Sequence, residues 1–214
     1  MDKAHHLVAH QFEDVDQQRE AVSLGMWAFL VTEIMFFGGV FAAYAVCRGL
    51  YPDAFSEASN KLNVVLGAVN TAVLICSSLS MAMAVRSTQL GKQKQIVPFL
   101  LLTIILGLAF LGIKAFEYSH KFHEHLFPGT TFHFEGPNSP QAQIFFIFYF
   151  AMTGLHAVHM IIGIGLMVWL VVQAKRGRFN AAYNSPVEVS GLYWHFVDIV
   201  WIFLFPLLYL ISRA

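Results

Sequence analysis

The chain has 214 residues, and its 13 basic and 13 acidic side chains give it a formal net charge of zero. Hydrophobic residues make up 57% of the chain and charged residues 12%, about half the charged share of a typical soluble domain. These values exclude a soluble enzyme and a nucleic-acid-binding protein, which would need a basic surface stripe. They indicate an integral membrane protein.

Five apolar segments follow a polar leader at residues 1–21. Each is long enough to cross a bilayer, because a spanning helix needs about 20 mostly apolar residues. The chain is therefore predicted to be all-α, with residues 1–214 forming one membrane domain built as a bundle of five transmembrane helices. The predicted helices cover residues 22–47, 62–85, 96–119, 142–173 and 187–212.

The distribution of basic residues predicts how the bundle is oriented, because Lys and Arg concentrate on the cytoplasmic side. The N-terminus and the loops after the second and fourth predicted helices carry eight basic residues, whereas the other side carries five at most. The N-terminus is therefore predicted inside and the C-terminus outside. This orientation makes residues 120–141 an outer loop.

Six polar residues interrupt the predicted helices, and they form the candidate site: Glu33, Asn70, His156, His159, His195 and Asp198. Glu33 lies about 17 Å into its helix, near the middle of a hydrocarbon core about 30 Å thick. The same counting places all of these residues except Asn70 near mid-membrane, which predicts one buried polar layer. No Lys or Arg is predicted at that depth, so a histidine, His156 or His159, is the expected partner of Glu33.

His195 and Asp198 share one helix face, because three residues advance a helix by nearly one turn. A charged Asp at the centre of a membrane helix costs about 2.5 to 3.5 kcal/mol, so this face is expected to point into the bundle. Two interpretations remain open. The two side chains either only bond neighbouring helices, or they handle protons or substrate directly.

A haem or metal enzyme is a competing hypothesis, because paired membrane histidines can hold haems or di-iron centres. Only three histidines lie well inside the predicted membrane segments, and a di-iron site needs two Glu-x-x-His motifs. Glu117 with His120 has that spacing once, at the membrane edge. The sequence therefore predicts no catalytic, cofactor-binding or metal-binding residue. A proton-coupled transporter is the other alternative, although no internal repeat supports it.

The sequence also predicts an ion pair, a close contact between helices and the role of the outer loop. Lys114 and Glu117 are expected to pair at the membrane surface, near the end of the third predicted helix. Gly154 is expected to let the fourth predicted helix approach a neighbour closely. The outer loop is expected to face a partner rather than a metal, despite its four histidines: His120, His123, His125 and His133.

Several motifs occur in the order typical of one protein family. They are Trp27–Phe37 (WAFLVTEIMFF), Asn70 and Thr71 with Ser77 and Ser78, Phe116–Tyr118 (FEY), Thr153–Gly163 (TGLHAVHMIIG) and Tyr193–Phe205 (YWHFVDIVWIFLF). Together they resemble subunit III of haem–copper cytochrome c oxidase over residues 20–212, in a form with five helices rather than seven. By this resemblance, Glu33 is the family's intramembrane carboxylate, and its polar companions are His156, His159, His195 and Asp198.

The resemblance implies an accessory role in aerobic respiration. The chain would hold structural phospholipid, stabilise subunit I as its main contact and support proton uptake, while the haems and copper reside in partner subunits. Further partners would be subunit II, a small subunit or a supercomplex, and cytochrome c as an indirect donor. The expected location is a bacterial inner membrane. A quinol oxidase subunit III and a nitric oxide reductase accessory protein are the alternatives, and the TEIMFF setting of Glu33 favours the cytochrome c branch.

Overall fold

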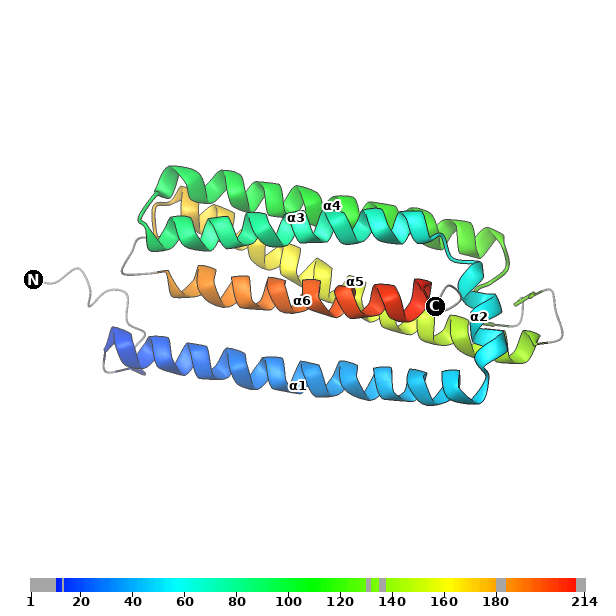
Figure 1. Ribbon diagram of the computed structural model, residues 1–214. Helices are drawn as coiled ribbons and strands as arrows, with labels where there is room; N and C mark the ends of the chain where they lie inside the picture. The colour runs from blue at the N-terminus through cyan, green and yellow to red at the C-terminus, as the bar shows by residue number, and fades with distance from the viewer. Residues whose placement is uncertain (1–10, 13, 130–131, 135–137, 180–183, 211–214) are drawn as a thin grey trace, which may run out of the picture.

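The computed structural model describes all residues except 1–10, 13, 130–131, 135–137, 180–183 and 211–214, and its described part is entirely helical. Six helices follow one another along the chain (Figure 1). Their bounds are α1 Val15–Leu50, α2 Pro52–Asn60, α3 Val64–Gln89, α4 Gln93–His123, α5 Ser139–Lys175 and α6 Ser185–Tyr209. Five of them, all but α2, are long and apolar enough to span a membrane. The predicted fold class is confirmed.

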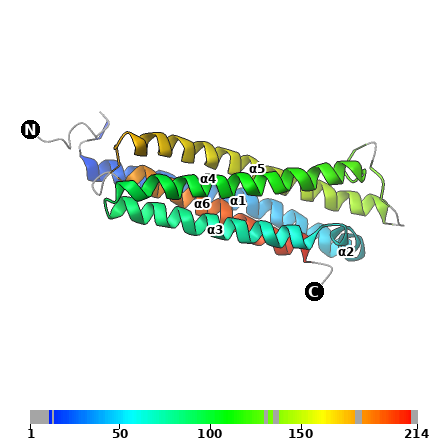
Figure 2. The same ribbon diagram turned by 90° about the horizontal axis from the view of Figure 1, so that it is seen from above.

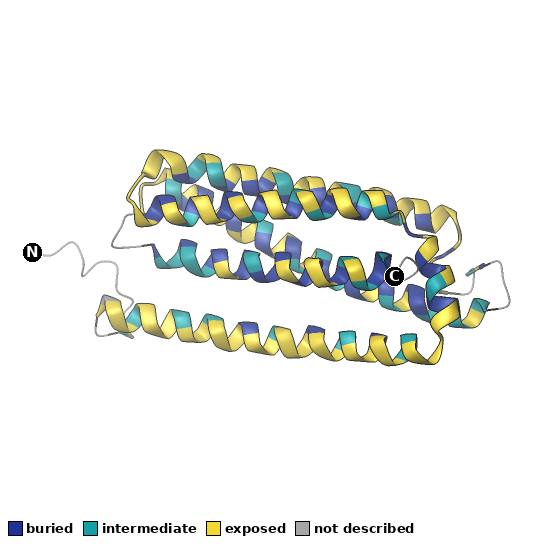
Figure 3. Ribbon diagram, in the orientation of Figure 1, coloured by how far each residue is buried: buried dark blue, intermediate teal, exposed yellow. Residues whose placement is uncertain are grey.

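The helices form an elongated bundle in which α6 is central (Figures 1 and 2). Helix α6 packs against α1, α3 and α5, and 56% of its most apolar segment is buried. Helix α1 packs only along one edge of the bundle, and 17% of its corresponding segment is buried. Figure 3 shows α1 as mostly exposed and α6 as mostly buried. The polar motif of α6 is therefore held at the centre of the protein.

Helix α1 begins at Val15, seven residues before the predicted start of the first spanning helix at residue 22. The Asp14 side chain caps the helix by accepting a hydrogen bond from the Gln17 backbone N–H at 2.7 Å. Aspartate is among the preferred N-cap residues because its carboxylate satisfies an N–H that has no partner within the helix. The apolar pattern begins only later, and hydropathy therefore placed the start too late.

Helix α2 was not predicted. It lies across one end of the bundle in Figures 1 and 2, and its first residue is Pro52, whose fixed φ suits the first turn of a helix. Its inner face buries Phe55, and the Ser59 hydroxyl donates to the Leu208 carbonyl at 2.8 Å. A nine-residue helix without an apolar run gives no membrane signal, so the sequence indicated a loop here.

The other boundaries differ at the helix ends. Helix α4 continues to His123 and α5 begins at Ser139, so the predicted outer loop of residues 120–141 is shortened at both ends. Helix α6 ends at Tyr209 rather than at residue 212, and residues 211–212 lie outside the described part. Polar residues extend α4 and α5 beyond their apolar segments, which explains why hydropathy underestimates the length of these two helices.

Candidate functional site

Glu33 of α1 and His159 of α5 form a pair. Glu33 Oε2 lies 3.1 Å from His159 Nε2, and both side chains are less than one-fifth exposed. The other ring nitrogen, Nδ1, lies 2.8 Å from the Leu155 carbonyl oxygen, and the Tyr193 hydroxyl donates to the His159 carbonyl at 3.0 Å. The prediction that a histidine partners Glu33 is confirmed, and that histidine is His159.

The hydrogen bonds of His159 fix what this pair can do chemically. A carbonyl oxygen only accepts, so Nδ1 must carry the hydrogen, and a neutral ring then has a bare Nε2. Either Glu33 is a neutral acid that donates to Nε2, or His159 is an imidazolium that donates to a Glu33 carboxylate. In both states one proton is shared between α1 and α5, which is the arrangement of a proton-holding pair.

His156 occupies a different environment, although it lies only three residues before His159. Its ring is packed at 5.4 Å from the ring of Phe110 and at 5.3 Å from that of Trp201, measured between centroids. The ring is buried, and neither nitrogen has a hydrogen-bond partner among the described residues. The two histidines therefore do not act as a matched pair of ligands.

His195 and Asp198 lie where α6 meets α3. Ser78 Oγ is 2.8 Å from His195 Nδ1. Asp198 is 3% exposed and lies beside Ser78, yet neither of its carboxyl oxygens has a hydrogen-bond partner in the described part of the chain. These three side chains line a groove of about 370 Å³ between the two helices. The expected contact with a neighbouring helix is confirmed for His195.

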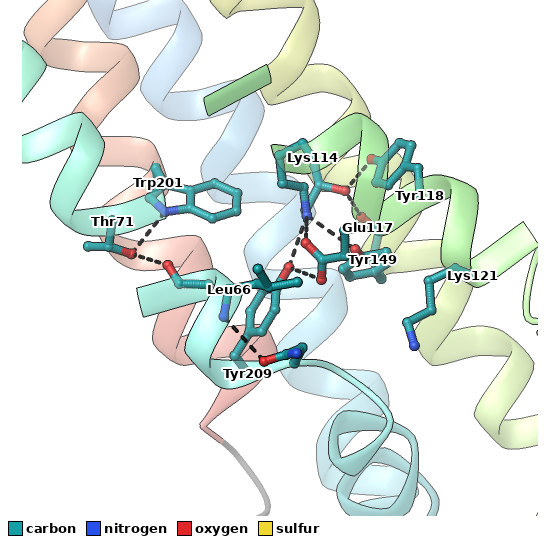
Figure 4. Close-up of polar contacts among 12 residues, drawn as sticks. Leu66, Thr71, Lys114, Glu117, Tyr118, Lys121, Tyr149, Trp201 and Tyr209 are labelled. Carbon is teal, nitrogen blue, oxygen red and sulfur yellow. Dashed lines mark hydrogen bonds and ion pairs between the residues drawn. The ribbon is translucent and has the colours of Figure 1, made fainter. Parts of the chain in front are cut away.

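Asn70 is fully buried on α3, and both atoms of its side-chain amide lack partners among the described residues. The adjacent Thr71 makes the interhelical contact instead. Its hydroxyl accepts a hydrogen bond from Trp201 Nε1 at 3.0 Å and donates to the Gly67 carbonyl at 2.8 Å (Figure 4). The hydrogen bond to α6 thus comes from the residue next to the predicted one.

The six predicted residues therefore do not form one connected layer. Glu33 and His159 join α1 to α5, and His195 with Asp198 lies on the α3 side of α6. Within the described part of the chain, no hydrogen bond links these two groups. Helical spacing indicates the depth of a residue but not the side of the helix on which its partner lies, and this is why the layer was predicted as a unit.

A buried cluster around Lys114 is the main polar feature whose enclosure the sequence did not predict (Figure 4). Lys114 Nζ donates to Glu117 Oε2 at 2.9 Å, to the Tyr209 hydroxyl at 2.9 Å and to the Tyr149 hydroxyl at 3.1 Å. The Tyr209 hydroxyl in turn donates to Glu117 Oε1 at 2.7 Å. All three N–H donors of the ammonium group make hydrogen bonds. Each of these hydrogen bonds is charge-assisted, because its donor is a cation.

The predicted pairing of Lys114 with Glu117 is confirmed, and the pair is enclosed by other helices rather than exposed. Both residues are buried within the bundle, at 4% and 3% exposure. The ammonium also lies within 5.6 Å of the ring centroids of Tyr118, Tyr149, Trp201 and Tyr209. The sequence could not reveal this enclosure, because Tyr149 and Tyr209 come from two other helices far along the chain.

The predicted close approach at Gly154 is wrong: among the described residues, the only atom within 4 Å of a Cβ added there is the Tyr118 hydroxyl oxygen at 3.9 Å. The close approach occurs at Gly163, where an added Cβ would lie 2.9 Å from the Trp194 ring. A Cβ added at Gly107 of α4 would also lie 2.9 Å from the Trp194 ring, and Trp194 Nε1 donates to the Ser77 hydroxyl of α3 at 3.1 Å. One indole ring therefore sets the packing of three helices around α6.

Comparison with known proteins identifies the class to which these features belong. The helical bundle and its intramembrane polar contacts define a multi-pass membrane protein, and residues 8–213 match the family model described as cytochrome c oxidase subunit III. The chain belongs to that family.

Named relatives come from two branches. A quinol oxidase subunit 3 of Bacillus spizizenii is 32% identical over 194 residues, covering 88% of this chain and 86% of the relative. A probable cytochrome c oxidase subunit 3 of Nocardia farcinica is 34% identical over 190 residues, covering 89% and 88%. A cytochrome c oxidase subunit 3 of Corynebacterium diphtheriae is 35% identical over 193 residues, covering 89% and 88%.

Proposed function

We propose that this chain is the accessory subunit III of a haem–copper cytochrome c oxidase in a bacterial inner membrane. It contacts subunit I most extensively and subunit II or a further subunit less so, and cytochrome c donates electrons elsewhere in the complex. The haems and copper belong to the partner subunits. The chain itself stabilises subunit I, binds phospholipid and supports proton uptake.

The accessory role is supported by the contacts that the histidines and carboxylates of the bundle make with other side chains and with the backbone. Haem ligation by a helical bundle needs imidazoles that face a shared cofactor space. His156 is packed between two aromatic rings, and both nitrogens of His159 are occupied by Glu33 and Leu155. Glu117, the carboxylate of the one Glu-x-x-His spacing, is bonded to Lys114 and Tyr209. These side chains do not fit a haem or a di-iron centre.

The exposure of α1 supports lipid binding. Large apolar side chains on several sides of this helix are exposed, Leu24, Val31, Ile34 and Met35 among them. Shallow hollows also lie beside α1 near both of its ends, one lined by Gln18 and Trp169 and the other by Tyr44 and Arg48. Acyl chains along α1 with headgroups at these ends would cover the exposed surface.

The Glu33–His159 pair supports a part in proton uptake. It holds one exchangeable proton between two helices, and it is partly rather than fully buried. A group of this kind can accept and release a proton with little movement of the backbone.

The second candidate is the corresponding subunit of a quinol oxidase. It is favoured by the Bacillus spizizenii relative, whose identity to this chain is close to that of the cytochrome c oxidase relatives. The TEIMFF segment around Glu33 favours the cytochrome c branch. Both candidates give this chain the same accessory role, and they differ only in the electron donor of the complex.

The test is to purify the chain from its native membrane in mild detergent and identify the polypeptides that accompany it. The expected result is co-purification with subunits I and II, with a haem spectrum from the complex and none from the separated chain. Oxygen consumption with reduced cytochrome c or with a quinol then identifies the branch. A haem spectrum from this chain alone would overturn the accessory role.

A further inference from the structure

Two polar side chains in the core of the bundle lack hydrogen-bond partners among the described residues. Both amide atoms of Asn70 on α3 and both ring nitrogens of His156 on α5 are buried without such a partner. The two residues are 0% and 1% exposed. Buried polar groups are nearly always bonded to protein or to ordered water, because an unpaired group is destabilising. These atoms therefore need a partner that the surrounding side chains do not supply.

The indole of Trp201 on α6 lies between the two side chains. Its Nε1 donates to the hydroxyl of Thr71, the residue next to Asn70. The centroid of its ring is 5.3 Å from that of the His156 ring. Asn70 and His156 thus lie in one region of the core, although they belong to helices far apart in the sequence.

The ring of Phe110 on α4 belongs to the same region. Its centroid is 5.4 Å from that of the His156 ring. Helices α3 and α4 run in opposite directions, and the Ser77 hydroxyl of α3 donates to the Thr103 carbonyl of α4. About two turns further along each helix lie Asn70 and Phe110, at the same level in the bundle. The two unpaired side chains therefore flank the same pair of aromatic rings.

The nearest polar groups have no free hydrogen to offer. Lys114 Nζ lies 5.3 Å from the Trp201 ring centroid, but its three donors are used by Glu117, Tyr149 and Tyr209. The Thr71 hydroxyl, on the other side of the indole in Figure 4, already donates to the Gly67 carbonyl. A partner for the unpaired atoms must therefore be a molecule that enters the bundle.

An open hollow leads toward these side chains from the end of the bundle at which α3 begins and α4 ends. It has a volume of about 640 Å³, and its walls include Leu66 of α3 and Glu117 of α4. Asn70 follows Leu66 by one turn on the same face of α3, and Lys114 and Phe110 continue the face of Glu117 inward along α4. The hollow and the unpaired side chains are therefore joined by two adjacent helix faces.

We propose that Asn70 and His156 bind ordered water inside the bundle, and that this water enters through the hollow beside Glu117. Water suits both side chains because it donates and accepts. A neutral imidazole has one N–H and one bare nitrogen, and an amide has both kinds of group. Buried waters typically make about three hydrogen bonds to such groups. Because Lys114 and Glu117 lie along this route, the same water solvates their ion pair.

X-ray radiolytic footprinting of the protein purified from its native membrane tests for the water. Radiation converts a bound water into a hydroxyl radical, which oxidises the side chains in contact with it. Phe110 is expected to be oxidised severalfold faster than Phe145, although both are 0% exposed. Phe145 is the matched control because it packs against the rings of Tyr44, Phe55 and Phe146. A rate at Phe110 no higher than that at Phe145 would overturn the water site.

Asn70→Leu tests whether the water is held by the amide. The expected result is that oxidation of Phe110 falls toward the level of Phe145, without a rise in the unfolding temperature. An amide with no bonded water would give the opposite result, because an apolar side chain in place of an unpaired polar one is stabilising. Unchanged oxidation of Phe110 in this variant would overturn the role of Asn70. If the variant does not fold, the wild-type comparison decides alone.

Heavy-oxygen water added shortly before irradiation tests the route of entry. The label reaches the oxidised Phe110 only as fast as the internal water exchanges. Leu66→Trp narrows the hollow and is expected to slow this incorporation. Val69→Trp is the matched control, because Val69 is 46% exposed on α3 and is not among the residues that line the hollow. Equal effects of the two substitutions would show that water does not enter beside Glu117.

Discussion

Glu33 and His159 differ from the other buried polar residues because they share a proton whichever of the two carries it. This property follows from the Leu155 carbonyl, which forces the hydrogen of the ring onto Nδ1. The pair also fastens α1, the least enclosed helix, to α5. The Glu33–His159 contact therefore both holds a proton and attaches α1 to the bundle.

Glu33→Ala should weaken the attachment of α1 by about 1 to 3 kcal/mol, because it leaves His159 Nε2 without a partner. Glu33→Gln is the matched control, since its amide can still donate to Nε2 but cannot release a proton. Oxygen reduction should persist in assembled complexes of both variants, while proton release falls in both and assembly falls only with Ala. Complete loss of oxygen reduction in a fully haem-loaded complex would make Glu33 catalytic and contradict the accessory role.

Lys114 depends on partners from three helices, and its removal should therefore cost far more than loss of a surface ion pair. Lys114→Met leaves the buried Glu117 carboxylate without its cationic partner. Breaking a buried ion pair in this way lowers the free energy of unfolding by about 3 to 5 kcal/mol. The double variant Lys114→Met, Glu117→Leu should recover most of that loss, because no uncompensated charge remains. Thermal unfolding of the wild type, Lys114→Met, Glu117→Leu and the double variant in detergent measures the coupling, and additive effects would contradict it.

At the scale of the helices, α6 is central because Trp194 reaches every long helix around it except α1. Its indole fits against Gly107 of α4 and Gly163 of α5 and donates to Ser77 of α3. The two glycines matter for the space they leave rather than for backbone flexibility. Interhelical packing in membranes depends on such small residues, because lipid and protein are equally apolar.

Gly163→Ala should destabilise the bundle by about 1 to 3 kcal/mol, because the new Cβ would lie 2.9 Å from a fully buried indole ring. Gly165→Ala on the same helix is the control. Nothing lies within 4 Å of its added Cβ, so it should be neutral or stabilising by about 0.5 to 1 kcal/mol through helix propensity. Thermal unfolding of the purified protein measures both, and equal stabilities would show that the α5–α6 contact relaxes around the methyl group.

At the scale of the whole molecule, the orientation in the membrane remains a prediction from the distribution of basic residues. In a background of Cys47→Ala and Cys76→Ala, an impermeant thiol reagent should label Gly129→Cys from outside the intact cell. Gln95→Cys, in the first turn of α4, should react only after the membrane is broken. Both engineered sites are exposed in the structure, so the reverse pattern would mean that the N-terminus lies outside.

The sequence by itself determined the number of spans, the approximate limits of the long helices, the six polar candidates and the family. These features are local or periodic. Segments that lie in lipid are apolar, so their hydropathy identifies them. The motifs Thr153–Gly163 and Tyr193–Phe205 are each one continuous stretch of sequence. Ionisable residues inside an apolar segment stand out because a membrane offers them no water.

Only the tertiary structure decided which polar residues meet. His159 rather than His156 faces Glu33, Tyr149 and Tyr209 enclose Lys114, and Asp198 is left without a partner in a groove. These outcomes depend on the rotation of each helix about its axis, which is set by side-chain packing between helices. Such packing joins residues that are 35 to 126 positions apart, and no local pattern in the sequence predicts it.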